Sequence, residues 1–220
     1  MLLQIANALD APEVAAVRDA LADDALWEDG ANTAAGRARA AKNNLQSRAA
    51  APAVKGALAK VRAALMANEV FKAAAQPAGF ARMIASCYGP GMAYGAHVDA
   101  PYIDGARTDL SFTLFLSEPD DYDGGALVID SPASEDSIKL PAGSVALYPS
   151  TYLHRVDEVT RGERLAVIGW ATSRIRSAEH RAMLFELETA LADLRAADAP
   201  APVCDSLLNL RNNLLRAWGE

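Results

Sequence analysis

The chain has 220 residues, of which 51% are apolar and 22% charged, and its formal net charge is −7. This composition excludes an extended disordered chain, and the acidic charge argues against nucleic acid as a partner. There is no apolar run of about 18 residues or more and no basic leader, so we predict neither a spanning helix nor a signal peptide, and we expect a cytoplasmic protein without a membrane partner.

The N-terminal third is predicted to be mainly helical. Residues 11–23 carry apolar side chains at helical spacing behind Asp10, a suitable N-cap, and a second helix is predicted over residues 51–68. Residues 31–50 between them show no period, which predicts a loop. Residues 31–68 are basic and contain no acidic side chain. They form either a solvated face or a patch for an anionic substrate.

From residue 82 the sequence changes to short apolar runs separated by Gly, Pro and Asp, which is typical of strands. Short strands at this spacing indicate a sandwich or a jelly roll. Cys87 lies in the first of them, and with the distant Cys204 it is predicted to be a reduced packing residue. The predicted strands span residues 82–88, 94–98, 110–117, 125–129, 137–140, 144–148, 153–157 and 163–173.

The C-terminal segment returns to a helical period. Two helices are predicted at residues 178–196 and 203–218, separated by the proline-containing break at 199–202. Their leucine and aromatic faces are expected to pack against the strands, and the alternative is a homodimer interface. His180 is predicted to be a surface residue of the first helix.

A candidate metal site follows the glycine-rich turn after Tyr88. His97 and Asp99 are two residues apart, so in an extended segment both side chains project from one face. His154, at the start of a later strand, offers a third ligand. Two histidines and one carboxylate form the facial triad that suits non-heme Fe(II) and oxygen chemistry. The alternative is a core His97 that is hydrogen-bonded to Asp99.

Arg164 strengthens the prediction of a site. It lies in the apolar strand over residues 163–173, where an arginine must either find an anion or remain at the surface, because burying an unpaired guanidinium is very costly. An inward-facing Arg164 can hold one carboxylate of a dicarboxylate through paired hydrogen bonds. The alternative is a surface salt bridge with Glu163 or Asp157.

Together these residues resemble the Fe(II)/2-oxoglutarate dioxygenases in their prolyl-hydroxylase-like branch, and more closely the bacterial PKHD-type hydroxylases. The similarity covers nearly the whole chain. It rests on Tyr88-Gly-Pro-Gly, Tyr94-Gly-Ala-His97-Val-Asp99, Arg107-Thr-Asp-Leu-Ser111, Tyr122-Asp-Gly-Gly125, Leu147-Tyr-Pro-Ser150, His154, Gly162-Glu-Arg164, Trp170, Arg181-Ala-Met-Leu-Phe-Glu186 and Leu207-Leu-Asn-Leu210.

The resemblance implies an α+β fold: a double-stranded β-helix, or distorted jelly roll, with supporting N-terminal helices and a C-terminal helical extension. It implies a dioxygenase domain over residues 1–176, with its jelly-roll core at about 80–174, and an extension over 177–220. Fe(II) would be held by His97, Asp99 and His154. Arg164 would bind the distal carboxylate of 2-oxoglutarate, and Tyr88 would add a hydroxyl. L-ascorbate would keep the iron reduced.

The implied reaction is hydroxylation of an unidentified peptide or amino-acid-derived substrate, with release of succinate and CO2. Lys42 and Asn44 are expected either to line the mouth of the site or to lie in a solvated loop. Tyr94 and Tyr102 are expected to pack rather than to contact substrate. The alternatives are a noncatalytic iron-binding or iron-sensing jelly roll and a cupin-like metal enzyme without an oxo-acid cosubstrate.

Overall fold

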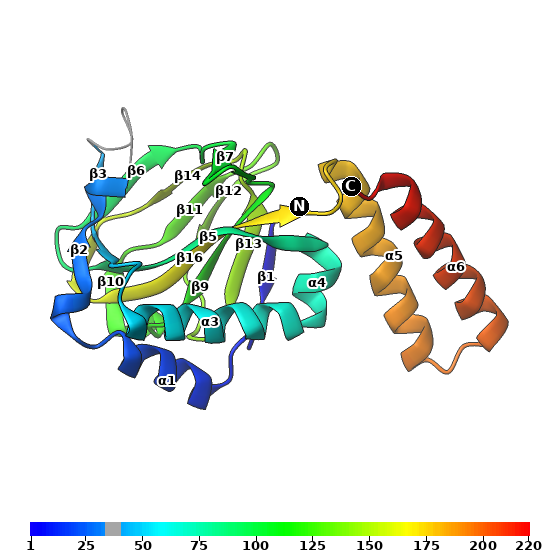
Figure 1. Ribbon diagram of the computed structural model, residues 1–220, viewed down its shortest axis with the longest axis horizontal. Coiled ribbons are helices and arrows are strands. Elements are labelled where there is room, and N and C mark those ends of the chain that lie inside the picture. The colour runs from blue at the N-terminus through cyan, green and yellow to red at the C-terminus, as the bar shows by residue number, and fades with distance from the viewer. Residues whose placement is uncertain (34–40) are drawn as a thin grey trace.

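The computed structural model describes residues 1–33 and 41–220. Residues 34–40, which include Arg37 and Arg39 of the predicted basic segment, lie outside the described residues. The described chain forms two antiparallel sheets, flanked by N-terminal helices and followed by two long C-terminal helices (Figure 1). The predicted α+β jelly roll is therefore confirmed.

The larger sheet has seven strands in the described residues. In spatial order they are β1 (Leu3–Ile5), β13 (Val145–Pro149), β9 (Leu110–Phe115), β16 (Arg164–Ser173), β5 (Pro77–Tyr88), β4 (Leu45–Ser47) and β2 (Trp27–Asp29). The centre of this sheet is the long pair β5–β16, in which Arg164 is the Cα partner of Tyr88. This pairing sets Arg164 beside the start of the glycine-rich turn.

The smaller sheet faces the larger one. Its strands in spatial order are β12 (Glu135–Ile138), β11 (Leu127–Asp130), β14 (Leu153–Val156), β6 (Ala93–His97) and β3 (Lys42–Asn43). Two short ribbons complete the strands, β7 (Tyr102–Ile103) with β8 (Ala106–Arg107), and β10 (Tyr122–Gly124) with β15 (Val159–Gly162). A buried apolar cluster that includes Phe115, Ile129 and Val156 fills the space between the sheets.

Residues 31–50 were predicted to be a loop, and the prediction is wrong for part of this segment. It contains the 3-10 turn Gly30–Thr33 at its start and the short strands β3 and β4. Lys42 pairs with Tyr94 of β6, and Leu45 pairs with Cys87 of β5. Strands of two or three residues show no periodicity, so only pairing with distant neighbours creates them.

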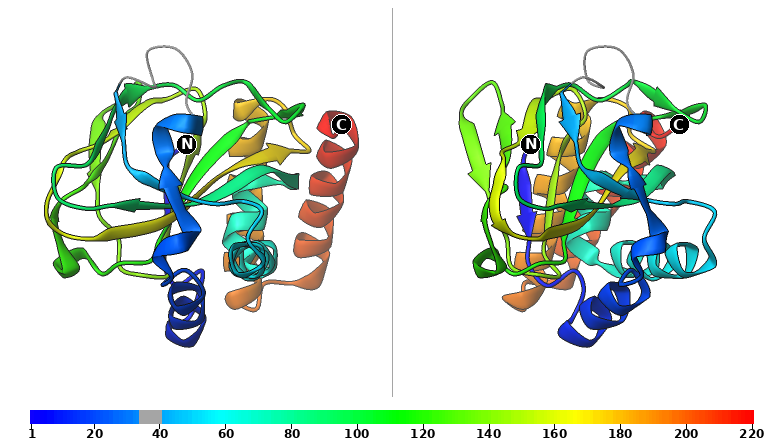
Figure 2. Two further views of the ribbon diagram at one scale, coloured as in Figure 1. Left: turned by 60° about the vertical axis from the view of Figure 1, so that its left-hand side comes forward. Right: turned by 90° about the vertical axis from the view of Figure 1, so that its left-hand side faces the viewer.

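The N-terminal helices cover the outer face of the larger sheet and lie on the opposite side of the molecule from β6 and the β7–β8 ribbon (Figures 1 and 2). Helix α1 (Ala11–Ala20) begins behind Asp10, whose carboxylate accepts a hydrogen bond from the backbone N–H of Glu13. Helix α3 (Pro52–Ala67) buries Val54 and Val61 and is followed by the short helix α4 (Glu69–Ala75). Both long helices were predicted.

The C-terminal helices α5 (Ala178–Ala196) and α6 (Ala201–Trp218) form an antiparallel pair. Helix α5 packs against α4, whereas α6 packs against α5 and is the outermost element of this side (Figure 1). The expectation that these helices pack mainly against the strands is therefore wrong, because α5 packs mainly on α4 and α6 on α5. His180 is half-buried rather than fully exposed, because its ring stacks on Trp218 at 4.0 Å between centroids. None of the described helices is long and apolar enough to span a membrane.

Candidate active site

Three candidate metal ligands meet on neighbouring strands of the smaller sheet. His97 ends β6 and is the Cα partner of His154 on β14, and Asp99 follows His97 by two residues. Nε2 of His97 lies 3.9 Å from Oδ1 of Asp99, and Nε2 of His154 lies 3.7 Å from Oδ2 of Asp99. One ligand atom from each residue lies within 4.8 Å of the others. The structure thus brings the three predicted ligands together. The 3.9 Å between Nε2 of His97 and Oδ1 of Asp99 is too long for a hydrogen bond, so the alternative of a core His97 bonded to Asp99 is not met.

Backbone carbonyls orient both imidazoles. Nδ1 of His97 lies 2.9 Å from the carbonyl oxygen of Gly95, and Nδ1 of His154 lies 3.0 Å from that of Tyr152. A carbonyl can only accept, so Nδ1 carries the proton in both rings and the lone pair is on Nε2. This is the arrangement found in metal-ligating histidines, whose other nitrogen donates to an outer partner. Both lone pairs therefore lie on the Asp99 side of the rings.

Aromatic and cationic side chains form the next layer around His97. The ring of Tyr94 stacks on the His97 imidazole at 3.7 Å between centroids, so Tyr94 packs, as predicted. The ammonium of Lys42 lies 5.0 Å from the Tyr94 ring centroid, and burial lowers the pKa of Lys42 to about 8. Lys42 lines the cavity and Asn44 is buried, donating to the hydroxyl of Ser86. The alternative of a solvated loop is therefore wrong for both residues.

A cavity of about 300 Å³ runs from the histidine cluster to Arg164. Arg164 is 1% exposed, and its guanidinium carbon lies 5.3 Å from the ring centroids of both Tyr88 and Phe115. None of its three nitrogens has a hydrogen-bond partner among the described residues. The alternative of a surface salt bridge with Glu163 or Asp157 is therefore wrong. An unpaired buried cation is very costly, which points to an anion that this cavity binds.

Two buried tyrosines, Tyr88 and Tyr122, lie close enough to Arg164 to feel its charge. Burial raises the pKa of Tyr88, and the charge of Arg164 together with the polar side chains of Ser86, on the same strand, and Asn44 opposes this shift. Tyr122 is completely buried, and its hydroxyl has no geometrically well-formed partner among the described residues. Burial raises the pKa of Tyr122, and the nearby charge of Arg164 opposes this shift. Tyr122 therefore places a second buried hydroxyl close to Arg164.

Sequence reasoning missed a site role for Tyr122, which it used only within the Tyr-Asp-Gly-Gly motif of the family resemblance. The signal was the Tyr-Asp-Gly-Gly pattern itself. A Cβ on Gly125 would lie within 3.0 Å of the Tyr122 ring, and Gly125 has a φ of +63°. Glycine at this position therefore makes room for the ring as well as for the turn. The expectation that Tyr102 packs is wrong, because its side chain on β7 is 59% exposed.

The buried imidazole of His97 predicts a pH effect on the metal-free protein. Burial, reinforced by the neighbouring His154, lowers the pKa of His97 from 6.5 to about 4. Between these values the unfolded chain binds a proton that the folded chain does not. The free energy of unfolding should therefore fall as the pH falls from 6.5 to 4, by up to about 3 kcal/mol. Urea unfolding of chelator-treated wild type and His97→Gln at pH 7.5 and 5 measures this, and equal losses in both proteins would contradict it.

Comparison with known families agrees with this geometry. The sequence model of the 2OG-Fe(II) oxygenase superfamily matches residues 83–172, and that of the PKHD-type hydroxylase C-terminal domain matches residues 179–220. A PKHD-type hydroxylase of Parvibaculum lavamentivorans is 47% identical over the full length of both chains. Another, of Maricaulis maris, is 43% identical, again over both full lengths.

Solved structures share the fold. A Pseudomonas putida prolyl-4-hydroxylase is 24% identical with a TM-score of 0.55, and the match covers 79% of this chain and 92% of that one. A Trichoplax adhaerens prolyl hydroxylase, solved with a hypoxia inducible factor peptide fragment, is 16% identical with a TM-score of 0.62 over 78% of this chain and 83% of its own. From the full-length identities and the matched superfamily, the chain belongs to the PKHD-type hydroxylases, Fe(II)- and 2-oxoglutarate-dependent dioxygenases of the 2OG-Fe(II) oxygenase superfamily.

Proposed function

We propose that this dioxygenase hydroxylates a C–H bond of a peptide or amino-acid-derived substrate and releases succinate and CO2. The observation that carries the proposal is the unpaired, fully buried Arg164 in the same cavity as the His97, Asp99 and His154 cluster. A dicarboxylic oxo acid fits a cavity with a metal cluster at one end and a guanidinium at the other, because each of its ends can bind one of them. The peptide preference is suggested by the prolyl hydroxylases that share the fold.

In this proposal His97, Asp99 and His154 hold Fe(II), through two neutral imidazoles and one carboxylate. Arg164 binds the distal carboxylate of 2-oxoglutarate through charge-assisted hydrogen bonds. Tyr88 packs its ring against the guanidinium and adds its hydroxyl to the same pocket, and Tyr122 offers a further hydroxyl close to Arg164. When bound, Fe(II) and 2-oxoglutarate supply the oxygen activation and the reducing equivalents for hydroxylation.

The remaining cavity residues shape the entrance for the prime substrate. The β7–β8 ribbon is held by the ion pair between Arg82 on β5 and Asp104 at the ribbon tip. Ile103 of this ribbon and Trp170 of β16 line the cavity on that side, and Lys42 lines it from β3. The indole N–H of Trp170 has no partner among the described residues, so it is available to a substrate carbonyl.

The test is turnover of labelled 2-oxoglutarate. Purified protein with Fe(II), ascorbate and 1-14C-labelled 2-oxoglutarate should release labelled CO2 and form an equal amount of succinate, slowly without a prime substrate. The release should stop when a chelator removes the iron. Iron binding without any binding of 2-oxoglutarate would instead favour the noncatalytic iron-binding module. Turnover that does not depend on an oxo acid would favour the cupin-like alternative.

We also propose the division of the chain at residues 176 and 177, because the two matched family regions lie on either side of it. Ascorbate is proposed as the reductant that keeps the iron ferrous, and repeated turnover should decline faster without it. A cytoplasmic location is proposed because both cysteines are free and buried, and thiols and Fe(II) persist in a reducing compartment. The net charge of −7 supports the proposed absence of nucleic-acid and membrane partners.

A homodimer is proposed through the outer edge of α6. This helix contacts α5 on one side and leaves Val203 and Leu210 about half exposed on the other. Exposed apolar side chains aligned on one helix edge are typical of helix pairing. Sedimentation analysis of the full chain should give a dimer that Leu210→Glu converts to a monomer, and a monomeric wild type would refute it.

A further inference from the structure

We propose that Ser111, supported by Ser150, is the residue that positions the Asp99 carboxylate toward the two histidines. The inference rests on the proposed metal site and adds a residue that acts on it from the facing sheet. Oγ of Ser111 lies 2.5 Å from Oδ2 of Asp99 and 2.8 Å from Oγ of Ser150. Ser111 is on β9 of the larger sheet, so this contact crosses from one sheet to the metal cluster of the other.

Ser111 is a buried polar residue in a strand whose other side chains, apart from that of Thr113, are apolar. All six residues of β9, Leu-Ser-Phe-Thr-Leu-Phe, are buried, and Ser111 is 2% exposed. A buried hydroxyl without a hydrogen bond costs free energy relative to an apolar side chain. Ser150, which is also buried, lies just beyond the end of β13. The Ser111 hydroxyl contacts the Asp99 carboxylate and the Ser150 hydroxyl contacts Ser111, so the three side chains form a buried polar relay.

The number of protons on these groups fixes which group donates each hydrogen bond. The Asp99 carboxylate is acceptor-only when ionised, so the single proton of Ser111 must be donated to Oδ2. The Ser111 oxygen can then only accept from its other neighbour. Ser150 therefore donates to Ser111, and Ser111 donates to Asp99. In such a chain each hydrogen bond polarises the next, and a bond to a charged acceptor is the stronger kind.

The backbone after Asp99 is held by the residues that lead into the same strand. The hydroxyl of Thr108 donates to the carbonyl of Ala100 at 2.5 Å, and the N–H of Thr108 donates to the carbonyl of Pro101 at 3.1 Å. Asp99 is thus fixed twice, at its carboxylate by Ser111 and along its following loop by Thr108. Both contacts come from the segment that spans residues 107–111.

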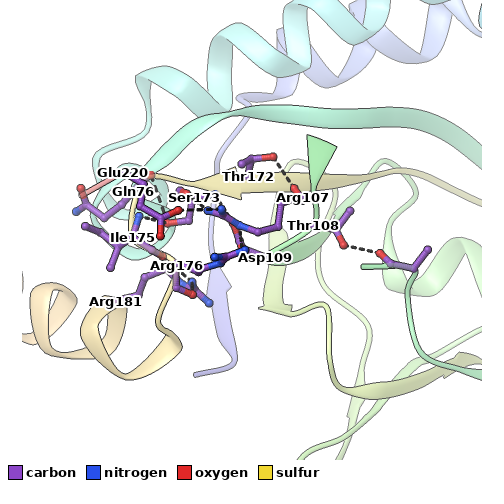
Figure 3. Close-up of polar contacts among 11 residues, drawn as sticks. Gln76, Arg107, Thr108, Asp109, Thr172, Ser173, Ile175, Arg176, Arg181 and Glu220 are labelled. Carbon is purple, nitrogen blue, oxygen red and sulfur yellow. Dashed lines mark hydrogen bonds and ion pairs between the residues drawn. The ribbon is translucent and has the colours of Figure 1, made fainter. Parts of the chain in front are cut away.

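That segment is itself anchored to the end of β16 and to the C-terminus (Figure 3). Nε of Arg107 donates to both carboxylate oxygens of Asp109, at 2.8 and 3.0 Å, and Oδ2 of Asp109 accepts from the N–H of Ser173. Arg107 also forms an ion pair with Glu220 at 3.1 Å and donates to the carbonyl of Ser173. The donor that orients Asp99 is therefore carried by a rigid part of the fold.

Asp99 is consequently oriented before any metal arrives, and binding does not have to select one rotamer of a free carboxylate. Loss of an outer partner of this kind costs roughly 10–100-fold in metal affinity. Ser111→Ala should lower the affinity by that factor, as measured by anaerobic titration with Fe(II) and with Mn(II) as a redox-stable probe. Ser111→Thr keeps the hydroxyl at the edge of the cavity, so it should retain nearly wild-type affinity.

Substituting Ser150 tests whether the hydrogen bonds run from Ser150 through Ser111 to Asp99. Because Ser150 acts only through Ser111, Ser150→Ala should weaken metal binding less than Ser111→Ala does. The double variant should bind metal as Ser111→Ala does, without further loss. The matched control is Ser117→Ala, which removes a buried hydroxyl with two hydrogen bonds about 20 Å farther along the same chain segment. It should lower the Tm of the metal-free protein but leave the metal affinity unchanged.

Three results would overturn the inference while the metal site stands. They are wild-type affinity in Ser111→Ala, equal loss in Ser117→Ala, and additive losses in the double variant. A wild-type protein that binds neither metal would refute the proposed metal site and this inference with it. Should Ser111→Ala fail to fold, as judged by the Tm of its metal-free form, Ser150→Ala against Ser117→Ala decides the question, since equal affinities would refute the relay.

Discussion

Replacing Arg164 with leucine is expected to weaken 2-oxoglutarate binding by on the order of 100-fold while Fe(II) stays bound. The guanidinium is fully buried and all its nitrogens lack partners among the described residues, so a ligand carboxylate is its expected counter-charge. Removing the cation leaves that carboxylate buried without a partner, which is the costly case. The dissociation constant can be followed anaerobically through the visible band of the Fe(II)–oxo acid chelate.

Although Arg164→Leu should weaken 2-oxoglutarate binding, it should not destabilise the ligand-free protein. An unpaired buried charge is destabilising, and leucine fills a similar apolar volume between Tyr88 and Phe115. The Tm of ligand-free Arg164→Leu should therefore equal or exceed that of the wild type, while the stabilisation added by 2-oxoglutarate is lost. An arginine with a purely structural role would instead lower the Tm when it is replaced. An unchanged or raised Tm together with lost stabilisation by 2-oxoglutarate therefore identifies Arg164 as a binding residue.

Two comparisons make the Arg164 result specific. A 2-oxo acid without a distal carboxylate, such as 2-oxopentanoate, should bind the wild type and Arg164→Leu equally well. Arg155→Leu removes an arginine whose partners, Glu135 and Asp157, lie at the surface, and it should leave 2-oxoglutarate affinity unchanged. Tyr122→Phe should give a smaller loss than Arg164→Leu. Unchanged affinity for 2-oxoglutarate in Arg164→Leu would refute the proposed anchor.

Replacing His154 with alanine should abolish stoichiometric metal binding. Of the three clustered ligands, His154 is the one supplied by a different strand, and its Nε2 lies 3.7 Å from Asp99. Losing a direct ligand should reduce affinity by more than the roughly 10–100-fold that loss of an outer partner costs. Because the oxo acid chelates the metal, 2-oxoglutarate affinity should fall as well. Fe(II) and 2-oxoglutarate titrations measure both effects.

His180→Ala is the matched control, because it removes a histidine that lies outside the cluster. His180 stacks on Trp218 and helps to hold α6 against α5, so its loss should lower the Tm modestly and leave both affinities unchanged. The contrast with Arg164→Leu is also informative, since that variant loses the oxo acid but keeps the metal. A His154→Ala protein that retains one tightly bound Fe(II) would rule out His154 as a ligand.

Much of this protein was predictable from local patterns. The strands around β5, β9 and β16 alternate or run apolar between turn residues, and α1 begins at an N-cap and a proline, so their existence follows from short-range rules. The His-X-Asp spacing likewise places two candidate ligands at one strand end, because side chains alternate with period two. The same reasoning failed for β3 and β4, which are too short to show a period.

The tertiary structure alone decided how the distant parts meet. The register of β14 against β6 sets His154 beside His97, and the β5–β16 pairing sets Arg164 beside Tyr88, although many residues separate each pair in the chain. The same is true of Ser111, which reaches Asp99 from the facing sheet. By itself the sequence determined the ligand types, the strand and helix segments and the family resemblance. The burial of Arg164, the position of Tyr122 near Arg164 and the Ser150–Ser111–Asp99 relay depend on sheet pairing and packing between sheets, which no local spacing encodes.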